Sequence, residues 1–277
     1  AGAFYPADPG RLRSAIERCY GHRLGPGRLP GRAAARLPGC AGFIVPHAGY
    51  AYSGPIAAHA YARAAALGQP EVAVILGPNH SGAGAALALS PWEAWETPLG
   101  TVAVHTALGD ELAARVAGMR RDRSAHSQEH SLEVQLPFLV HAFGTRLPVL
   151  PIAIAAQDGE TAAALGEGLA AVLAGRSALV FASSDLSHYL SDDQARRRDA
   201  ATIDALRSMD PAVVAEASLS GEASLCGAGA VMALLAAARR LGIEGVDVLA
   251  YGTSGDTSGD RAWVVGYVAA QLGPTVV

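Results

Sequence analysis

The sequence predicts a single α/β domain: a central mixed, largely parallel sheet with helices on both faces. Short apolar runs of strand length alternate with helical segments along the whole chain, which is the pattern of a sheet covered by helices. Of the 277 residues, 51% are hydrophobic and 17% charged, which favours a large buried core and argues against disorder. No repeat and no break in composition divides the chain, so residues 1–277 are predicted to form one domain.

The expected elements follow from these runs and from capping residues. Asp8 and Pro9 are a typical cap and first position of a helix, which we expect to run to about Tyr20. Residues 21–40 are rich in Gly, Pro and Arg and predict a surface loop, and residues 92–98 and 252–260 are also expected to be irregular. Strands are predicted at 41–46, 71–76, 101–105, 147–154, 178–183, 246–251 and 262–270. Further helices are predicted at about 54–67, 109–119, 129–143, 158–174, 191–208, 210–219 and from the 225–229 segment to about 241.

Composition excludes several functional classes. All 21 basic residues are arginine, so a Schiff-base lysine, a pyridoxal-phosphate lysine and a nucleotide-binding Walker lysine are ruled out. The net charge of −4, without a dense basic patch, argues against nucleic acid as a partner. The apolar runs are too short for a membrane span and no secretion signal is visible, while three irregularly spaced cysteines suit a reducing compartment. We therefore expect a cytoplasmic protein with no membrane association.

Three of the predicted strands are each followed by a histidine. Residues 43–45 lead to His47, residues 72–76 lead to His80, and residues 178–183 lead to His188. A single histidine in such a place is usually structural. In an open α/β sheet, however, ligands bind at the carboxyl ends of the strands, so three histidines in equivalent positions predict a site there.

Other side chains with suitable chemistry lie near these positions in the sequence. Cys226 precedes an apolar helix, whose amide groups and dipole are expected to lower the pKa of the thiol, although a small buried hydrophobic side chain is the simpler interpretation. A thiolate and two imidazoles with an open position form a plausible site for Zn, Cu or Fe. Asp185 and His188 are candidates for proton transfer, or Asp185 and its neighbours cap the next helix. His130 and Glu133, three apart on a predicted helix, either reach the same crevice or pair with each other.

A competing pattern is His126-Ser127-Gln128-Glu129-His130, which matches the H-x-x-E-H signature of inverted zinc peptidases. That signature needs one continuous helix to bring both histidines to one metal. Ser127 resembles an N-cap, which would leave His126 outside the helix, so the match is weak. A serine hydrolase is disfavoured because the chain has no G-x-S-x-G motif.

Taken together, several segments resemble the Memo family in order along nearly the whole chain. They are residues 1–9 (AGAFYPADP), 45–54 (VPHAGYAYSG), 77–80 (GPNH), 129–137 (EHSLEVQLP), 183–189 (SSDLSHY) and 264–267 (VVGY). The resemblance implies the fold of class III extradiol ring-cleaving dioxygenases. It also implies a metal bound by His47, His80 and Cys226, with His188 as the acid/base histidine and Asp185 orienting or anchoring beside it. His130, Glu133, Tyr52 and Ser184 are candidates for contacting substrate or supporting the ligands.

Three functions are compatible with these residues. The preferred one is an oxidoreductase that depends on Fe(II) or Cu, with no nucleotide or pyridoxal cofactor. The second is a non-catalytic module that binds a peptide or small ligand and keeps a structural or vestigial metal. The third is a zinc hydrolase that uses a metal-bound water. The resemblance also implies functional association with a radical-SAM protein.

Overall fold

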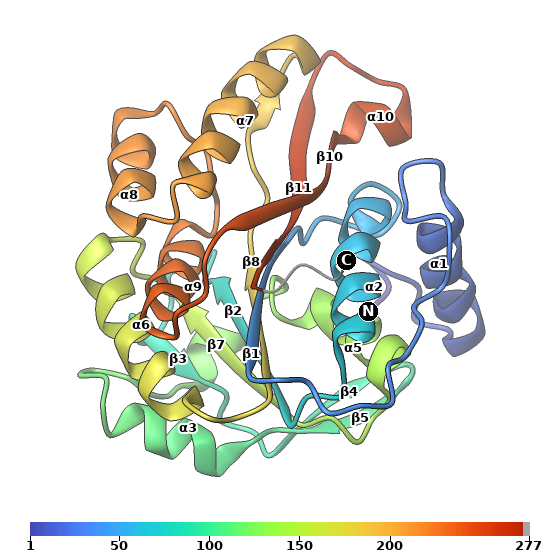
Figure 1. Cartoon of the computed structure of the whole chain (residues 1–277). Coiled ribbons are helices and arrows are strands. Elements are labelled where there is room, and N and C mark those ends of the chain that lie inside the picture. Colours follow the sequence, from blue (N-terminus) through green and yellow to red (C-terminus); the bar gives the residue numbers. More distant parts are fainter. Residues whose placement is uncertain (274–277) are drawn as a thin grey trace.

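A nine-stranded mixed sheet with helices on both sides forms the body of the protein (Figure 1), as a computed structural model describing residues 1–273 shows. The strand order is β10-β11-β1-β8-β2-β7-β3-β6, and β9 pairs with β11. The central strands β1, β8, β2 and β7 are parallel to one another, whereas β11 and β3 run antiparallel to β1 and β7. The predicted mixed, largely parallel sheet is confirmed.

The strands of this sheet are β1 (Cys40–Val45), β2 (Val72–Pro78), β3 (Leu87–Leu89), β6 (Arg120–Arg121), β7 (Val149–Ile154), β8 (Ala178–Ser183), β9 (His188–Leu190), β10 (Val246–Thr253) and β11 (Val264–Leu272). Every residue of β2, β7 and β8 is buried. Burial on both faces explains why these strands are continuous apolar runs rather than alternating ones. A separate hairpin pairs β4 (Ala94–Thr97) with β5 (Gly100–Ala103).

Helices cover both faces of the sheet (Figure 1), and a hydrophobic core lies between the sheet and the helices on each face. One face is covered by α3 (Thr106–Ala113), α6 (Gly159–Leu173), α7 (Asp192–Arg207), α8 (Pro211–Ser220) and α9 (Ala228–Arg240). The other is covered by α1 (Pro9–Gly21), α2 (Gly54–Leu67) and α5 (Leu136–Phe143). The short helices are α4 (Arg123–His126), the 3-10 turn η1 (Glu133–Gln135) and α10 (Ser254–Ser258). Asp8 caps α1 by accepting a hydrogen bond from the Arg11 amide at 2.8 Å, as expected.

Some expected elements differ from the structure. The predicted helix 129–143 is wrong in its first turns, because regular α-helix begins only at Leu136 and is preceded by a turn and η1. Part of residues 92–98 forms the β4 strand, and the 252–260 segment contains α10. The helix expected at 109–119 ends at Ala113. The strands β3, β6 and β9, of two or three residues each, are too short to show a hydrophobic period.

The three strands that precede the histidines are neighbours. β8 lies between β1 and β2 and is parallel to both, with Val45 opposite Ser183 and Leu76 opposite Ala182. Their carboxyl ends therefore open at the same edge of the sheet, and the loops that leave from that edge carry His47 and His80 and lead to His188 at the start of β9.

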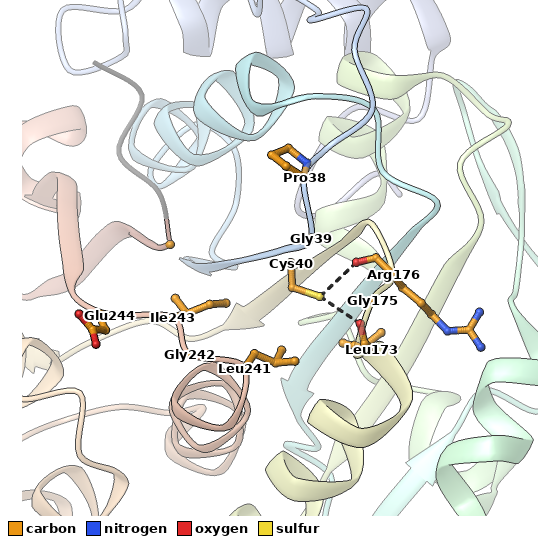
Figure 2. Close-up of a pocket in the computed structure, with 11 residues that line it drawn as sticks. Pro38, Gly39, Cys40, Leu173, Gly175, Arg176, Leu241, Gly242, Ile243 and Glu244 are labelled. Atoms are coloured by element: carbon orange, nitrogen blue, oxygen red, sulfur yellow. Dashed lines mark hydrogen bonds between the residues drawn. The ribbon is translucent and has the colours of Figure 1, made fainter.

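A cavity of about 560 Å³ opens at the opposite, amino-terminal end of the parallel strands (Figure 2). Cys40 lines this cavity and its thiol donates to the carbonyl oxygens of Leu173 and Arg176, each at 3.6 Å. Burial raises the pKa of the Cys40 thiol. The residues that line the cavity include no histidine, unlike those at the carboxyl edge. Within residues 1–273, no helix is long and apolar enough to span a bilayer.

Candidate metal centre

Three histidines converge at the carboxyl edge of the sheet. One ligand atom from each of His47, His80 and His130 lies within 4.8 Å of the other two. His47 and His80 follow β1 and β2, and His130 comes from the turn before η1. The structure therefore brings together two of the predicted ligands with a histidine that was expected only to support them. Neutral imidazoles at this separation are common metal ligands.

His47 is 2% exposed, and its amide and both ring nitrogens have polar contacts. Its amide N–H donates to Asp185 Oδ1 at 2.8 Å, its Nδ1 lies 2.8 Å from Ser183 Oγ, and its Nε2 lies 3.2 Å from Cys226 Sγ. Burial lowers the pKa of His47 well below its usual value, and the charges of the two neighbouring histidines lower it further. His47 is therefore neutral at pH 7, which is the state that binds a metal.

His80 is oriented by Glu129, whose side chain is 1% exposed. Both carboxylate oxygens lie 3.1 Å from His80 Nδ1, and Oε2 also accepts the His80 amide N–H at 2.6 Å. The other oxygen accepts the amides of His130 and Ser131 at 2.8 and 2.6 Å. The hydrogen bond to Glu129 raises the pKa of His80. Burial by itself would raise the pKa of Glu129, but the hydrogen bonds from His80 and the backbone amides lower it to about 2. With Nδ1 engaged, Nε2 of His80 is the atom left for a ligand.

His130 lies in a stack of three rings. Its ring is 4.9 Å from that of His80 and 4.3 Å from that of Phe4, with interplanar angles of 17° and 13°. Burial is the largest influence on His130 and lowers its pKa. Phe4 therefore covers one face of His130 and keeps it neutral and fixed beside the other two histidines.

Cys226 lies next to His47, two residues before α9. Its Sγ accepts the Asp185 amide N–H at 3.1 Å, and its own amide donates to the Asp185 carbonyl at 3.2 Å. The expected low thiol pKa is wrong for the metal-free protein: burial raises the pKa of Cys226 to about 12, and the Asp185 carboxylate adds to this effect. The hydrogen bond from the Asp185 amide to the sulfur lowers the pKa of Cys226, but this effect is smaller than that of burial.

Asp185 lies on the loop after β8, as expected, and His188 follows that loop as the first residue of β9. Asp185 is 4% exposed, and burial raises its pKa to about 6 despite the hydrogen bond from His47. His188 is exposed, and its Nδ1 donates a hydrogen bond to the Leu186 carbonyl oxygen 2.8 Å away, which leaves Nε2 as the ring nitrogen that this hydrogen bond does not use. Neither Asp185 nor its serine neighbours cap α7, which begins with a capping box formed by Ser191.

The remaining candidates have different surroundings. Ser184 Oγ donates to the Asp185 carbonyl and accepts the Gly227 amide, at 2.8 and 3.0 Å, and so joins the two loops beside Cys226. Glu133 lies in η1, not on a regular helix with His130, and accepts a hydrogen bond from the Tyr5 hydroxyl. Tyr52 is 47% exposed.

His126, from the competing zinc-peptidase pattern, ends the short helix α4, and its Nε2 lies 3.1 Å from the Ala88 carbonyl. It does not belong to the cluster of three histidines.

Comparison with known proteins assigns the family. Residues 1–271 match the family described as Memo-like protein. A MEMO1 family protein of Methanopyrus kandleri is 43% identical over 273 residues, which cover 97% of this chain and 95% of the relative. A MEMO1 family protein of Thermotoga maritima is 40% identical over 274 residues, covering 98% and 97%. The chain belongs to the Memo-like family. An uncharacterized Escherichia coli K12 protein, JW3007, has the same fold at 13% identity, with a TM-score of 0.58 over 84% of this chain and 99% of that one.

The residues of this Memo-like centre fit a transition metal. His47 and His80 each have Nδ1 held by a protein oxygen, which leaves both Nε2 atoms to face a shared ligand. His130 offers a further nitrogen and Cys226 a sulfur that already contacts His47 Nε2. Nitrogen and sulfur donors suit Zn, Cu and Fe and not Mg or Ca.

Two residues that support this centre were not predicted as site residues from the sequence. Glu129 and Gln135 lie within the 129–137 segment, and both are buried polar residues. Glu129 directly precedes His130, and a carboxylate beside a potential ligand is a recognisable signal. Gln135 carried no such signal, because its contacts are with residues far from it in sequence.

Proposed function

We propose that this Memo-like protein is a metal-dependent oxidoreductase that uses Fe(II) or Cu to act on a small-molecule substrate. The observation that supports it is the convergence of His47, His80 and His130 on one point, with Cys226 Sγ 3.2 Å from His47 Nε2. His47, His80 and Cys226 would hold the metal, with His130 as the alternative third donor. When bound there, iron or copper would supply electron exchange with O₂.

The other residues of the site have roles that follow from their contacts. Glu129 fixes the ring of His80, and Asp185 fixes the backbone of His47. His188 offers Nε2, on an exposed ring, as the atom that accepts or returns a proton of the substrate. Phe4 stacks on His130, and Tyr5 packs against Tyr50, so the amino-terminal segment lies directly beside the site.

The decisive experiment is metal analysis of untagged protein purified without added metal, for the natural sequence and the Cys226→Ala and His130→Ala variants. Cys40→Ala is the matched control, since Cys40 lies at the other end of the sheet. We expect about one iron or copper per chain, kept in Cys40→Ala and lost in Cys226→Ala, with oxygen uptake that follows the metal. Loss in His130→Ala alone would make His130 the third ligand.

Two outcomes would contradict the proposal. Stoichiometric zinc with no oxygen uptake would favour a zinc hydrolase and its metal-bound water. Absence of metal, together with failure to bind Fe(II), Cu or Zn on reconstitution, would remove the metal function and leave a ligand-binding module.

A further inference from the structure

Ser183, the last residue of β8, contacts three polar groups at once. Its hydroxyl oxygen lies 2.8 Å from His47 Nδ1, 2.8 Å from the Ser131 carbonyl oxygen and 2.8 Å from Gln135 Nε2. The side chain is fully buried, so water does not compete for these contacts. A hydroxyl has one proton to donate, and the direction of each of these hydrogen bonds therefore follows from what the partners are able to do.

The orientation of the Gln135 amide is fixed by its other neighbours. Its Nε2 faces two carbonyl oxygens, that of Pro46 at 3.1 Å and that of Ser131 at 3.4 Å, while its Oε1 accepts the Tyr61 hydroxyl at 2.6 Å. In the reversed orientation, an amide oxygen would face two carbonyl oxygens, and buried acceptors without donors are costly. Gln135 therefore donates to Ser183.

The direction of the contact with His47 follows. The Ser131 carbonyl only accepts, so the one proton of Ser183 goes to it, and Ser183 must accept from both Gln135 and His47. His47 then carries its proton on Nδ1. The contact at Nε2 is consistent with this tautomer. Cys226 Sγ accepts a hydrogen bond from the Asp185 amide and can donate its own proton to an unprotonated Nε2.

We propose that Ser183 is a positioning residue that holds neutral His47 in the Nδ1–H tautomer, so that the Nε2 lone pair faces the centre. Gln135 and the Ser131 carbonyl keep Ser183 as an acceptor toward the ring. The tautomer is a property of the metal-free protein, and only its consequence for metal affinity rests on the proposed function. Contacts of this kind to a ligating histidine are generally worth about 10- to 100-fold in metal affinity.

The test measures the tautomer and the affinity separately. In metal-free protein labelled with ¹⁵N-histidine, with the His47 signals assigned by their loss in His47→Ala, we expect a protonated Nδ1 and a bare Nε2. In Ser183→Ala, Nδ1–H loses its buried acceptor, and we expect the proton to move to Nε2, where Cys226 Sγ can accept it. Zn²⁺ affinity, measured by calorimetry, should fall about 10- to 100-fold.

Ser177→Ala is the matched control. Ser177 is also buried, immediately precedes the same strand, and donates to the Leu37 carbonyl. It should lose stability without changing the His47 tautomer or Zn²⁺ affinity. A protonated Nε2 in the natural protein would overturn the proposal even if Ser183→Ala does not fold. An unchanged tautomer in a folded Ser183→Ala would overturn it too. Failure of the natural protein to bind Fe(II), Cu or Zn²⁺, with the Nδ1–H tautomer present, would count against the proposed function alone.

Discussion

Replacing Glu129 by glutamine tests how much this one carboxylate stabilises the site. In the folded protein Glu129 accepts hydrogen bonds from three backbone amides and from His80, and its pKa is about 2 against an ordinary value of 4.5. Each unit of difference corresponds to 1.36 kcal/mol, so the ionised carboxylate contributes about 3 kcal/mol to stability at pH 7. The side chain is 1% exposed, so solvent does not screen this value appreciably.

The assay is urea unfolding of metal-free Glu129→Gln and of the natural protein between pH 3 and pH 7. Because the folded-state pKa of Glu129 is lowered, its stabilisation is complete above the unfolded value of 4.5 and is lost as the pH falls toward about 2. The variant should therefore be about 3 kcal/mol less stable at pH 7, and the difference should shrink below pH 4.5.

Glu167→Gln is the matched control, because Glu167 forms an exposed ion pair with Arg240. Removing that pair should change stability by less than about 1 kcal/mol. A loss of less than about 1 kcal/mol in Glu129→Gln at pH 7, or a difference that does not change with pH, would refute the assignment of Glu129 as the anchor of His80.

Three further substitutions have predicted outcomes. Asp185→Asn should stabilise the metal-free protein at pH 7 by up to about 3 kcal/mol in urea unfolding, because a pKa of about 6 against 3.8 means that ionisation costs stability as the pH rises through this range. The gain should vanish near pH 3.5, and a gain that does not change with pH would contradict the raised pKa. Gly266→Ala should cost about 3 kcal/mol or more in the same assay, since an added Cβ would lie 1.9 Å from the buried Asp199 carboxylate; a variant of natural stability would be inconsistent with that contact. His126→Ala should bind Zn²⁺ with unchanged affinity by calorimetry, and weaker binding would revive the zinc-peptidase pattern.

The sequence predicted the sheet and the edge that carries the candidate site well because both depend on local patterns. Apolar runs of strand length mark β1, β2 and β8, and a histidine shortly after each run locates the edge. The parallel arrangement of these three strands, which the alternation with helices implies, then brings their carboxyl ends together.

The details of the site depend on contacts between distant residues, which a periodic pattern does not contain. Cys226 precedes a helix, and the local rule predicts a low thiol pKa. The structure buries that thiol against Asp185, forty-one positions away in the chain, and burial has the larger effect. His130 was expected on a helix, but it lies before η1, where Glu129 accepts the amides of His130 and Ser131.

The high pKa of Cys226 leads to a last prediction about metal binding. The thiol is protonated at pH 7 in the metal-free protein, and a cysteine ligates a metal as thiolate. The proton between Sγ and His47 Nε2, which are 3.2 Å apart, therefore has to leave when both atoms bind a metal. Calorimetry of Zn²⁺ binding at pH 7, in buffers that differ in ionisation enthalpy, should show about one proton released per metal, and Cys226→Ala should abolish this release. Binding of Zn²⁺ by the natural protein without proton release would show that Cys226 is not a ligand, and would make His47, His80 and His130 the complete ligand set.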